Sequence, residues 1–264
     1  MDVVIQMVAG LGIGTVVAGL SLVRPAQKAK IVLAGALGGV WADIDGLSLW
    51  AGFDRFIGGP LGLSESGFEI YFGTHWYSHQ SFFHSILGLV VMTGLLWYLS
   101  SMLYAHGLKR ARRWTQAAEY LAPYFYAFAG GYALHLVGDL FTPAGAWGGI
   151  RLLYPLDQYV GGWGMVWWWN NYDIFLLLCL ALVFNVFSLI AFSMLSKAGK
   201  WLPSVIYACC FLLVGLQFHY RNYDFNHQGY LPREAASHDF QKQVLSEPIY
   251  DAMVNLDKRL PVYF

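Results

Sequence analysis

Long apolar runs constrain this chain more than any other feature. A helix needs about 20 apolar residues to cross the hydrocarbon core of a bilayer. Six runs of about this length or slightly shorter lie at residues 3–23, 31–53, 82–105, 120–141, 174–195 and 201–218. Only 12% of the residues are charged, whereas a soluble domain carries about a quarter. We therefore predict an all-α protein, a polytopic transmembrane helical bundle of about six spans.

The chain changes character after the last apolar run. Residues 219–264 mix acidic and basic side chains and contain Pro248, a pattern that predicts short surface helices. We therefore divide the chain into a transmembrane domain that holds a metal site, residues 1–218, and a short extramembrane C-terminal tail, residues 219–264.

Lysine and arginine gather in three alternating connections between the expected spans. They are Arg24, Lys28, Lys30, Lys109, Arg110, Arg112, Arg113, Lys197 and Lys200. The intervening connections, residues 54–81 and 142–173, contain only two lysine or arginine residues, Arg55 and Arg151. Because basic residues are enriched on the cytoplasmic side of a membrane, we expect these two connections and both termini on the outer side. This topology requires an even number of spans.

Three pairs of ionisable residues interrupt the apolar runs or stand at their ends. They are Asp43 with Asp45, His79 with His84, and His135 with Asp139. Such residues are costly at membrane depth and usually face a cavity, an ion or a partner. The expected topology brings all three pairs to the outer end of their spans. We therefore predict that these six residues converge at one membrane face to bind metal.

The spacing within the pairs differs. His135 and Asp139 are four residues apart, so both lie on one face of a helix and can point at one ion. Asp43 and Asp45 are two residues apart and point in different directions from a regular helix. They share an ion only if the helix unwinds there, which Gly46 would permit, or they serve different ions.

Imidazole and carboxylate ligands together suit zinc, manganese or iron. We predict one or two divalent ions, with zinc as the leading candidate. Two ions would clamp a phosphoryl group, and a single zinc would leave one carboxylate as a general base. Asp43, Asp45 and His84 are the residues to which we assign catalytic roles.

Two other functions use the same residues. An ion- or proton-coupled transporter would need polar residues that continue across the membrane, for which Gln6 and Asn185 are the chief candidates. A non-catalytic membrane protein would use metal only to hold its helices together. The first of these is disfavoured because the other spans contain few polar residues.

The motifs resemble those of the LexA-binding, inner-membrane-associated, metal-dependent hydrolase family of bacteria and archaea. The similar segments are the opening MDVVIQMVAG, the acidic ADID ending at Asp45, HQSFFHS from residue 79, and GYALHLVGDLFTPAGAWGGIRLLYP from residue 131. The chain departs from the family pattern at three positions. Gln6 replaces a histidine, Gln80 an arginine and Phe83 a threonine.

The resemblance implies metal-dependent hydrolysis at the cytoplasmic (inner) membrane of a bacterium or archaeon. The segment ALHLVGDLFTP also resembles the His-x-x-x-Asp helix of zinc-dependent phospholipase C and single-strand nucleases, which implies phosphodiester chemistry. Trp163 and residues 167–169, all tryptophan, suit the headgroup level, either as anchors or as a wall for a lipid. We expect a membrane lipid as the substrate and no nucleic-acid partner, because no soluble domain is present to bind a large polymer.

Overall fold

The computed structural model describes residues 3–107, 114–142, 147–163, 172–191 and 199–220, and residues 247, 248, 251, 252 and 255. Within these ranges the fold is all-α, which confirms the expected fold class. Outside the helices, an isolated antiparallel bridge pairs Ile150 with Val160. The predicted C-terminal tail lies almost entirely outside the described residues.

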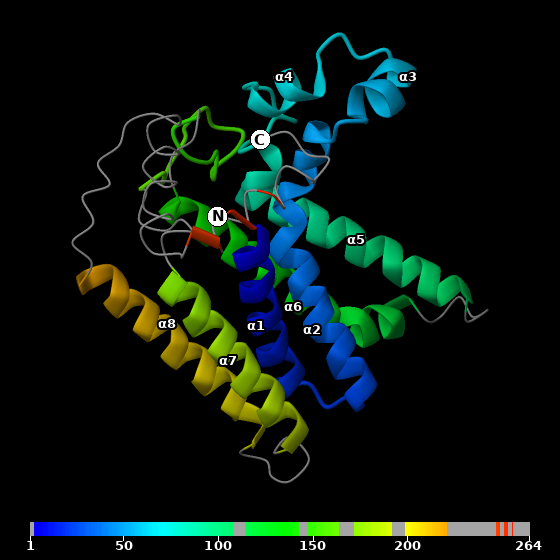
Figure 1. The fold of residues 1–264 in the computed structure, drawn as a ribbon. Helices are drawn as coiled ribbons and strands as arrows, with labels where there is room; N and C mark the ends of the chain where they lie inside the picture. The colour runs from blue at the N-terminus through cyan, green and yellow to red at the C-terminus, as the bar shows by residue number, and fades with distance from the viewer. Residues whose placement is uncertain are drawn as a thin grey trace. The chain divides into compact units, whose positions relative to one another are not determined.

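Five helices are long and apolar enough to cross a membrane: Val3–Leu20, Pro25–Leu49, Ile86–Gly107, Ile174–Ala191 and Gly199–Tyr220. In Figure 1 they correspond to α1 (Val3–Leu20), α2 (Pro25–Trp41) with η1 (Ala42–Leu49), α5 (Ile86–Gly107), α7 (Tyr172–Ala191), and η6 (Gly199–Trp201) with α8 (Leu202–Tyr220). Apolar helices of this kind satisfy their own backbone hydrogen bonds, as the bilayer requires.

The sixth expected run, residues 120–141, lies in α6 (Trp114–Phe141). This helix has 28 residues and is the longest one described, but it is not among the five apolar candidates. It contains Glu119, His135, Asp139 and an internal Pro123. The described part of the chain therefore contains five candidate spans and one further long helix.

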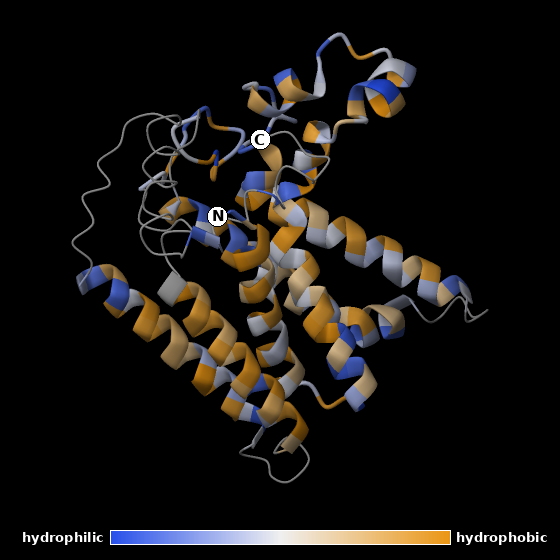
Figure 2. Cartoon of the chain, viewed as in Figure 1, coloured by the Kyte–Doolittle hydropathy of each residue, from blue (hydrophilic) through white to orange (hydrophobic). Residues whose placement is uncertain are grey.

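Contacts divide the chain into two compact units. The first, which we call the helix unit, comprises Met1–Ala42, Ile86–Gly138 and Asp173–Asn222. The second, which we call the loop unit, comprises Asp43–Ser85, Asp139–Tyr172 and Tyr223–Phe264. Figure 2 shows that the long helices are predominantly hydrophobic and that hydrophilic residues are frequent in the segments that connect them.

Glycines allow three helices of the helix unit to pack closely. A Cβ atom added to Gly10 of α1 would overlap the carbonyl oxygen of Gly35 in α2, and one added to Gly131 of α6 would overlap the same oxygen. Small residues at such contacts are typical of helix packing in membranes, where close van der Waals contact replaces the hydrophobic effect. Gly94 of α5, in contrast, faces open space.

Buried polar groups also join helices of this unit. Asn185 of α7 donates a hydrogen bond from Nδ2 to Oγ1 of Thr15 in α1, at 2.8 Å. Tyr207 of α8 donates from its hydroxyl to the carbonyl oxygen of Ala9, at 2.6 Å. Gln6 donates from Nε2 to the carbonyl oxygen of His135, at 3.3 Å. These contacts hold α7, α8 and α6 to α1.

The loop unit contains short helical segments between its connections. They are η1, the π-helical turn η2 (Asp54–Gly58), α3 (Gly59–Leu61), α4 (Gly67–Phe72) and η3 (Phe82–His84). Ser66 and Glu69 form a capping box at the start of α4. Asp54 accepts a hydrogen bond at Oδ1 from the backbone N–H of Gly67, at 2.7 Å, and so fixes η2 to α4.

The structure refines two local expectations. His84 lies in η3, before the third span, because α5 begins at Ile86. The α-helix does change at the acidic pair, since α2 ends at Trp41 and continues as the tighter η1. Gly46 is not sterically required for this change, because a Cβ atom there would meet nothing within 4 Å.

Candidate metal centre

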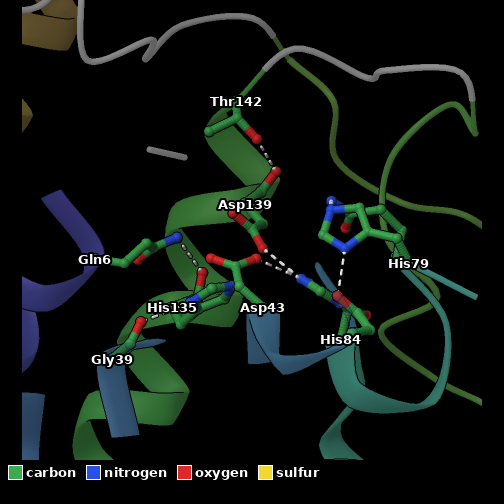
Figure 3. Close-up of polar contacts among 10 residues, drawn as sticks. Gln6, Gly39, Asp43, His79, His84, His135, Asp139 and Thr142 are labelled. Atoms are coloured by element: carbon green, nitrogen blue, oxygen red, sulfur yellow. Dashed lines mark hydrogen bonds and ion pairs between the residues drawn. The ribbon is translucent and has the colours of Figure 1, made fainter. Parts of the chain in front are cut away.

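The loop unit brings together five of the six predicted site residues. Asp43 and Asp45 come from η1, His84 from η3, Asp139 from the C-terminal end of α6, and His79 from the connection before η3. Figure 3 shows the side chains of Asp43, His79, His84 and Asp139 pointing toward one another. Three segments that lie far apart in the sequence thus contribute to a single cluster.

His84 stands at the centre of this cluster and is fully buried. Its Nε2 atom lies 3.5 Å from Oδ1 of Asp43 and 3.4 Å from Oδ2 of Asp139. Its Nδ1 atom lies 3.6 Å from Oδ2 of Asp45. Each of the two ring nitrogens therefore faces carboxylate oxygen, two carboxylates on one side and one on the other.

These distances suit ligands of one ion better than hydrogen bonds. Protein N–H···O bonds measure about 2.7–3.2 Å between heavy atoms. Two ligand atoms on one tetrahedral zinc lie roughly 3.4 Å apart, because each bond to the metal is about 2.0–2.2 Å long. The Nε2 atom of His84 and the facing oxygens of Asp43 and Asp139 have this spacing.

The charges of the cluster also favour a bound cation. Three carboxylates, those of Asp43, Asp45 and Asp139, surround two imidazoles, and four of the five side chains are nearly buried. Burying charge is costly unless it is compensated. With one of the imidazoles neutral, the cluster carries net negative charge, which a divalent cation would balance.

His79 is held differently from His84. Its Nδ1 atom lies 2.8 Å from Oδ1 of Asp45, and its Nε2 atom lies 2.9 Å from Nε2 of Gln80. Since an amide nitrogen only donates, the Gln80 contact requires Nε2 of His79 to accept when the ring is neutral, and it places the proton of the neutral ring on Nδ1, toward Asp45. The ring also stacks on Tyr71, with centroids 4.3 Å apart.

The two histidines differ in their protonation. Burial by itself lowers the pKa of His79, but the carboxylates of Asp45, Asp43 and Asp139 outweigh it and raise the pKa above its ordinary value. Burial, together with the neighbouring imidazole of His79, lowers the pKa of His84 despite the same carboxylates. Of the two, His84 therefore has the stronger tendency to be neutral, and neutral imidazole is the form that binds metal.

Backbone contacts fix the connection that carries His79. The N–H of His79 donates to the carbonyl oxygen of Tyr71, at 3.2 Å, and that of Phe82 donates to Trp76, at 3.1 Å. Gln80 adopts a left-handed conformation with φ of 62°. Its carbonyl oxygen accepts a hydrogen bond from the N–H of Arg151, at 2.9 Å, which stabilises this uncommon conformation.

His135, the sixth predicted residue, belongs to the helix unit and is fully buried there. Its Nδ1 atom lies 2.7 Å from the carbonyl oxygen of Gly39, which can only accept. The proton of the neutral ring therefore resides on Nδ1 and leaves Nε2 as the basic nitrogen. A carbonyl group that fixes the tautomer in this way is common behind metal-binding histidines.

The end of α6 supports Asp139. Thr142 donates a hydrogen bond from Oγ1 to the carbonyl oxygen of Asp139, at 2.9 Å, and so satisfies one of the last carbonyl groups of the helix. Asp139 follows His135 by four residues on this continuous helix. The predicted i, i+4 relationship of these two residues is therefore present in the structure.

A group of three residues within the loop unit also has the composition of a metal site. Asp45, His79 and His84 each offer one ligand atom, and these atoms all lie within 4.8 Å of one another. Asp43 and Asp45 face different nitrogens of His84. This geometry bears on whether the two acids serve one ion. The metal-binding role of all six residues stays a prediction.

Sequence reasoning missed several neighbours of the cluster. Gln80 contacts His79, and Trp147 lies edge-on to the same ring with centroids 5.1 Å apart. No spacing rule connects Tyr71 or Trp147 with His79. Trp163 is 53% exposed and packs on Phe141, while the tryptophans at 167–169 lie outside the described residues.

Comparison with known proteins identifies a family. The model of the YdjM inner membrane protein family matches residues 1–222, which is most of the chain. Neither curated proteins nor solved structures yield a match. The family and the apolar helices together support a multi-pass location in the inner membrane, as expected, whereas the match contains no statement about hydrolysis. The chain belongs to the YdjM inner membrane protein family.

Proposed function

We propose that this protein is a membrane-bound, metal-dependent hydrolase that acts on a phosphoester of a membrane lipid at the outer face of the inner membrane. One observation carries the proposal. The buried imidazole of His84 has carboxylate oxygens of Asp43 and Asp139 at 3.4–3.5 Å, a spacing typical of ligands that share an ion.

In this proposal Asp43, His84 and Asp139 hold a divalent ion, with zinc favoured over manganese or iron. His135 precedes Asp139 by one turn of α6, and helix geometry makes it the expected fourth ligand. When bound, such an ion would act as a Lewis acid on a phosphoryl group and lower the pKa of water.

Asp45 and His79 serve as the proton-transfer pair of the proposed enzyme. Asp45 orients the ring of His79 through Nδ1, at 2.8 Å, and stabilises positive charge on it. Nε2 then accepts or releases a proton, and the amide of Gln80 marks this nitrogen as a hydrogen-bond acceptor. A water or a substrate hydroxyl would take the place of that amide during the reaction.

The surroundings of His79 favour a substrate with apolar character. Tyr71 and Trp147 pack on its ring, and Trp147 stacks on Phe72 with centroids 5.5 Å apart. Such walls suit the glycerol and acyl carbons of a lipid more than a free, highly charged phosphate. The outward orientation rests on the distribution of lysine and arginine.

The transporter alternative receives less support. Gln6 and Asn185, the polar residues that would extend a path across the membrane, take part in contacts between helices. Their side chains are fully buried in the helix unit. These contacts account for both residues without a path for ions.

The proposal is tested in two steps. Elemental analysis of protein purified without chelator should find metal, and His84→Ala and Asp139→Asn should each lose most of it. His106→Ala is the matched control, because this exposed histidine lies at the end of α5, outside the cluster. His135→Ala tests the expected fourth ligand. Unchanged metal in both His84→Ala and Asp139→Asn would contradict the ligand assignment.

Activity is measured separately. The metal-loaded protein is incubated with a panel of phospholipids, and headgroup release is followed. We expect turnover that is lost in His84→Ala and kept in His106→Ala. If the protein contains metal but releases no headgroup from any lipid of the panel, the hydrolase proposal fails and metal serves only to hold the fold together.

A further inference from the structure

Residues 59–64 of the loop unit form a short apolar projection, which we call the leucine tip. Its sequence is Gly-Pro-Leu-Gly-Leu-Ser, so it carries no charge. All six residues are exposed in the described part of the chain. Leu61 is 70% exposed and Leu63 is 43% exposed. Two leucines without apolar neighbours to cover them are unfavourable in water.

The leucine tip is folded and not a loose loop. The N–H of Gly62 donates to the carbonyl oxygen of Gly59, at 3.0 Å, and that of Leu63 donates to Gly58, at 2.9 Å. Gly62 has φ of +66°, a left-handed conformation that glycine adopts without strain and that ends α3. The turn therefore holds both leucines outward in a defined conformation.

Two aromatic side chains flank the leucine tip in the sequence. Phe56 of η2 is 59% exposed and Phe68 of α4 is 57% exposed. The guanidinium group of Arg55 lies 5.2 Å above the ring of Phe56. Glu65 follows the leucine tip directly, so charges of both signs border it. A set of exposed leucine and phenylalanine side chains is typical of surfaces that contact lipid or another protein.

Chain connectivity indicates what the leucine tip contacts. The segment that contains the leucine tip leaves one apolar span at Leu49 and enters the next at Ile86. Both of its ends are therefore at the same membrane face, and η2 begins five residues after Leu49. The lipid of that face is thus the apolar medium within reach of these side chains.

We propose that the leucine tip, together with Phe56 and Phe68, inserts into the headgroup–acyl boundary of the bilayer that the spans cross. This proposal does not depend on metal binding or hydrolysis. It has a consequence for the cluster, because Phe68 and Tyr71 belong to the same short helix α4 and Tyr71 stacks on His79. Insertion would anchor a wall of the cluster at lipid depth.

The test places a fluorescent probe on the tip. In a variant with Cys179, Cys209 and Cys210 replaced by alanine, Leu61→Cys is labelled with an environment-sensitive NBD group. The protein is then placed in phosphatidylcholine nanodiscs with or without bromine on the acyl chains. Leu61 is a suitable position because its side chain is exposed, so the substitution leaves the packed residues unchanged.

Two matched positions calibrate the measurement. Ile190→Cys reports lipid, because Ile190 is 74% exposed within the span Ile174–Ala191. Thr74→Cys reports water, because Thr74 is exposed in a connection of the loop unit. We expect the probe at 61 to show blue-shifted emission and at least a twofold loss in brominated lipid, as at 190. Iodide should quench the probe at 74 and spare the one at 61.

Two outcomes would overturn the proposal. A probe at 61 that iodide quenches as strongly as at 74, with no effect of bromine, would place the leucine tip in water. A probe protected from both quenchers would show that protein covers the tip, either another segment of this chain or a second copy.

Discussion

The Nδ1 atom of His79 lies 2.8 Å from Oδ1 of Asp45, and this contact distinguishes the surroundings of the two acids in η1. Asp45 engages one histidine by a hydrogen bond and approaches Nδ1 of His84 at 3.6 Å through its other oxygen. Asp43 instead faces Nε2 of His84, on the side where Asp139 also lies. Neighbouring carboxylates thus face different nitrogens of the two histidines.

Substitutions of the two acids should therefore have different effects. Asp45→Asn keeps the shape and one acceptor oxygen but loses the charge that supports His79. We expect it to retain most of its metal and to lose about 10²- to 10⁴-fold in turnover, the usual contribution of general acid–base catalysis. Asp43→Asn should lose metal. Metal content and headgroup release are measured in both variants. Equal loss of metal in the two variants would indicate that Asp45 is a ligand.

Removing metal should destabilise the protein. If free metal stands at about 1,000 times its Kd, binding to the folded state contributes about 4 kcal/mol to the free energy of unfolding. A chelator should therefore lower the melting temperature measured in detergent, and added zinc should restore it. The His84→Ala variant should melt at the same temperature with and without chelator. A variant that still responds would have a metal site elsewhere.

Enlarging Gly35 should weaken the packing of α1 on α2. A Cβ atom there would overlap the backbone of Gly10, and overpacking costs about 1–3 kcal/mol. We expect Gly35→Ala to lower the melting temperature. Gly94→Ala is the control, because its new methyl group would face open space and alanine favours helix over glycine. Equal stability of the two variants would show that α1 and α2 separate at little cost.

The hydrogen bond between Asn185 and Thr15 should appear as coupling in a double-mutant cycle. Interhelical hydrogen bonds in membranes contribute about 0.6 kcal/mol on average. We expect a coupling energy of this size between Thr15→Val and Asn185→Leu in unfolding experiments. The control cycle pairs Asn185→Leu with Thr93→Val, whose hydroxyl has no hydrogen-bond partner in the described ranges. Coupling of zero in the first cycle would contradict the contact.

The sequence by itself determined the class of the protein and most of its spans. Long apolar runs admit few alternatives, because a backbone in lipid must satisfy its hydrogen bonds internally and does so as helix. The run 120–141 was harder to classify, since α6 carries His135 and Asp139 and falls short of the apolar candidates. The i, i+4 relationship of these two residues followed from helix periodicity alone.

Only the tertiary structure decided how the site residues meet. Sequence spacing left open whether Asp43 and Asp45 act together, and the path of η1 and η3 places them at different nitrogens of His84. The contacts of His79 with Tyr71 and Gln80 depend in turn on a left-handed residue and on backbone hydrogen bonds in a connection. The contacts of His84 with Asp43, Asp45 and Asp139 join segments distant in the chain, and local periodicity contains no information about them.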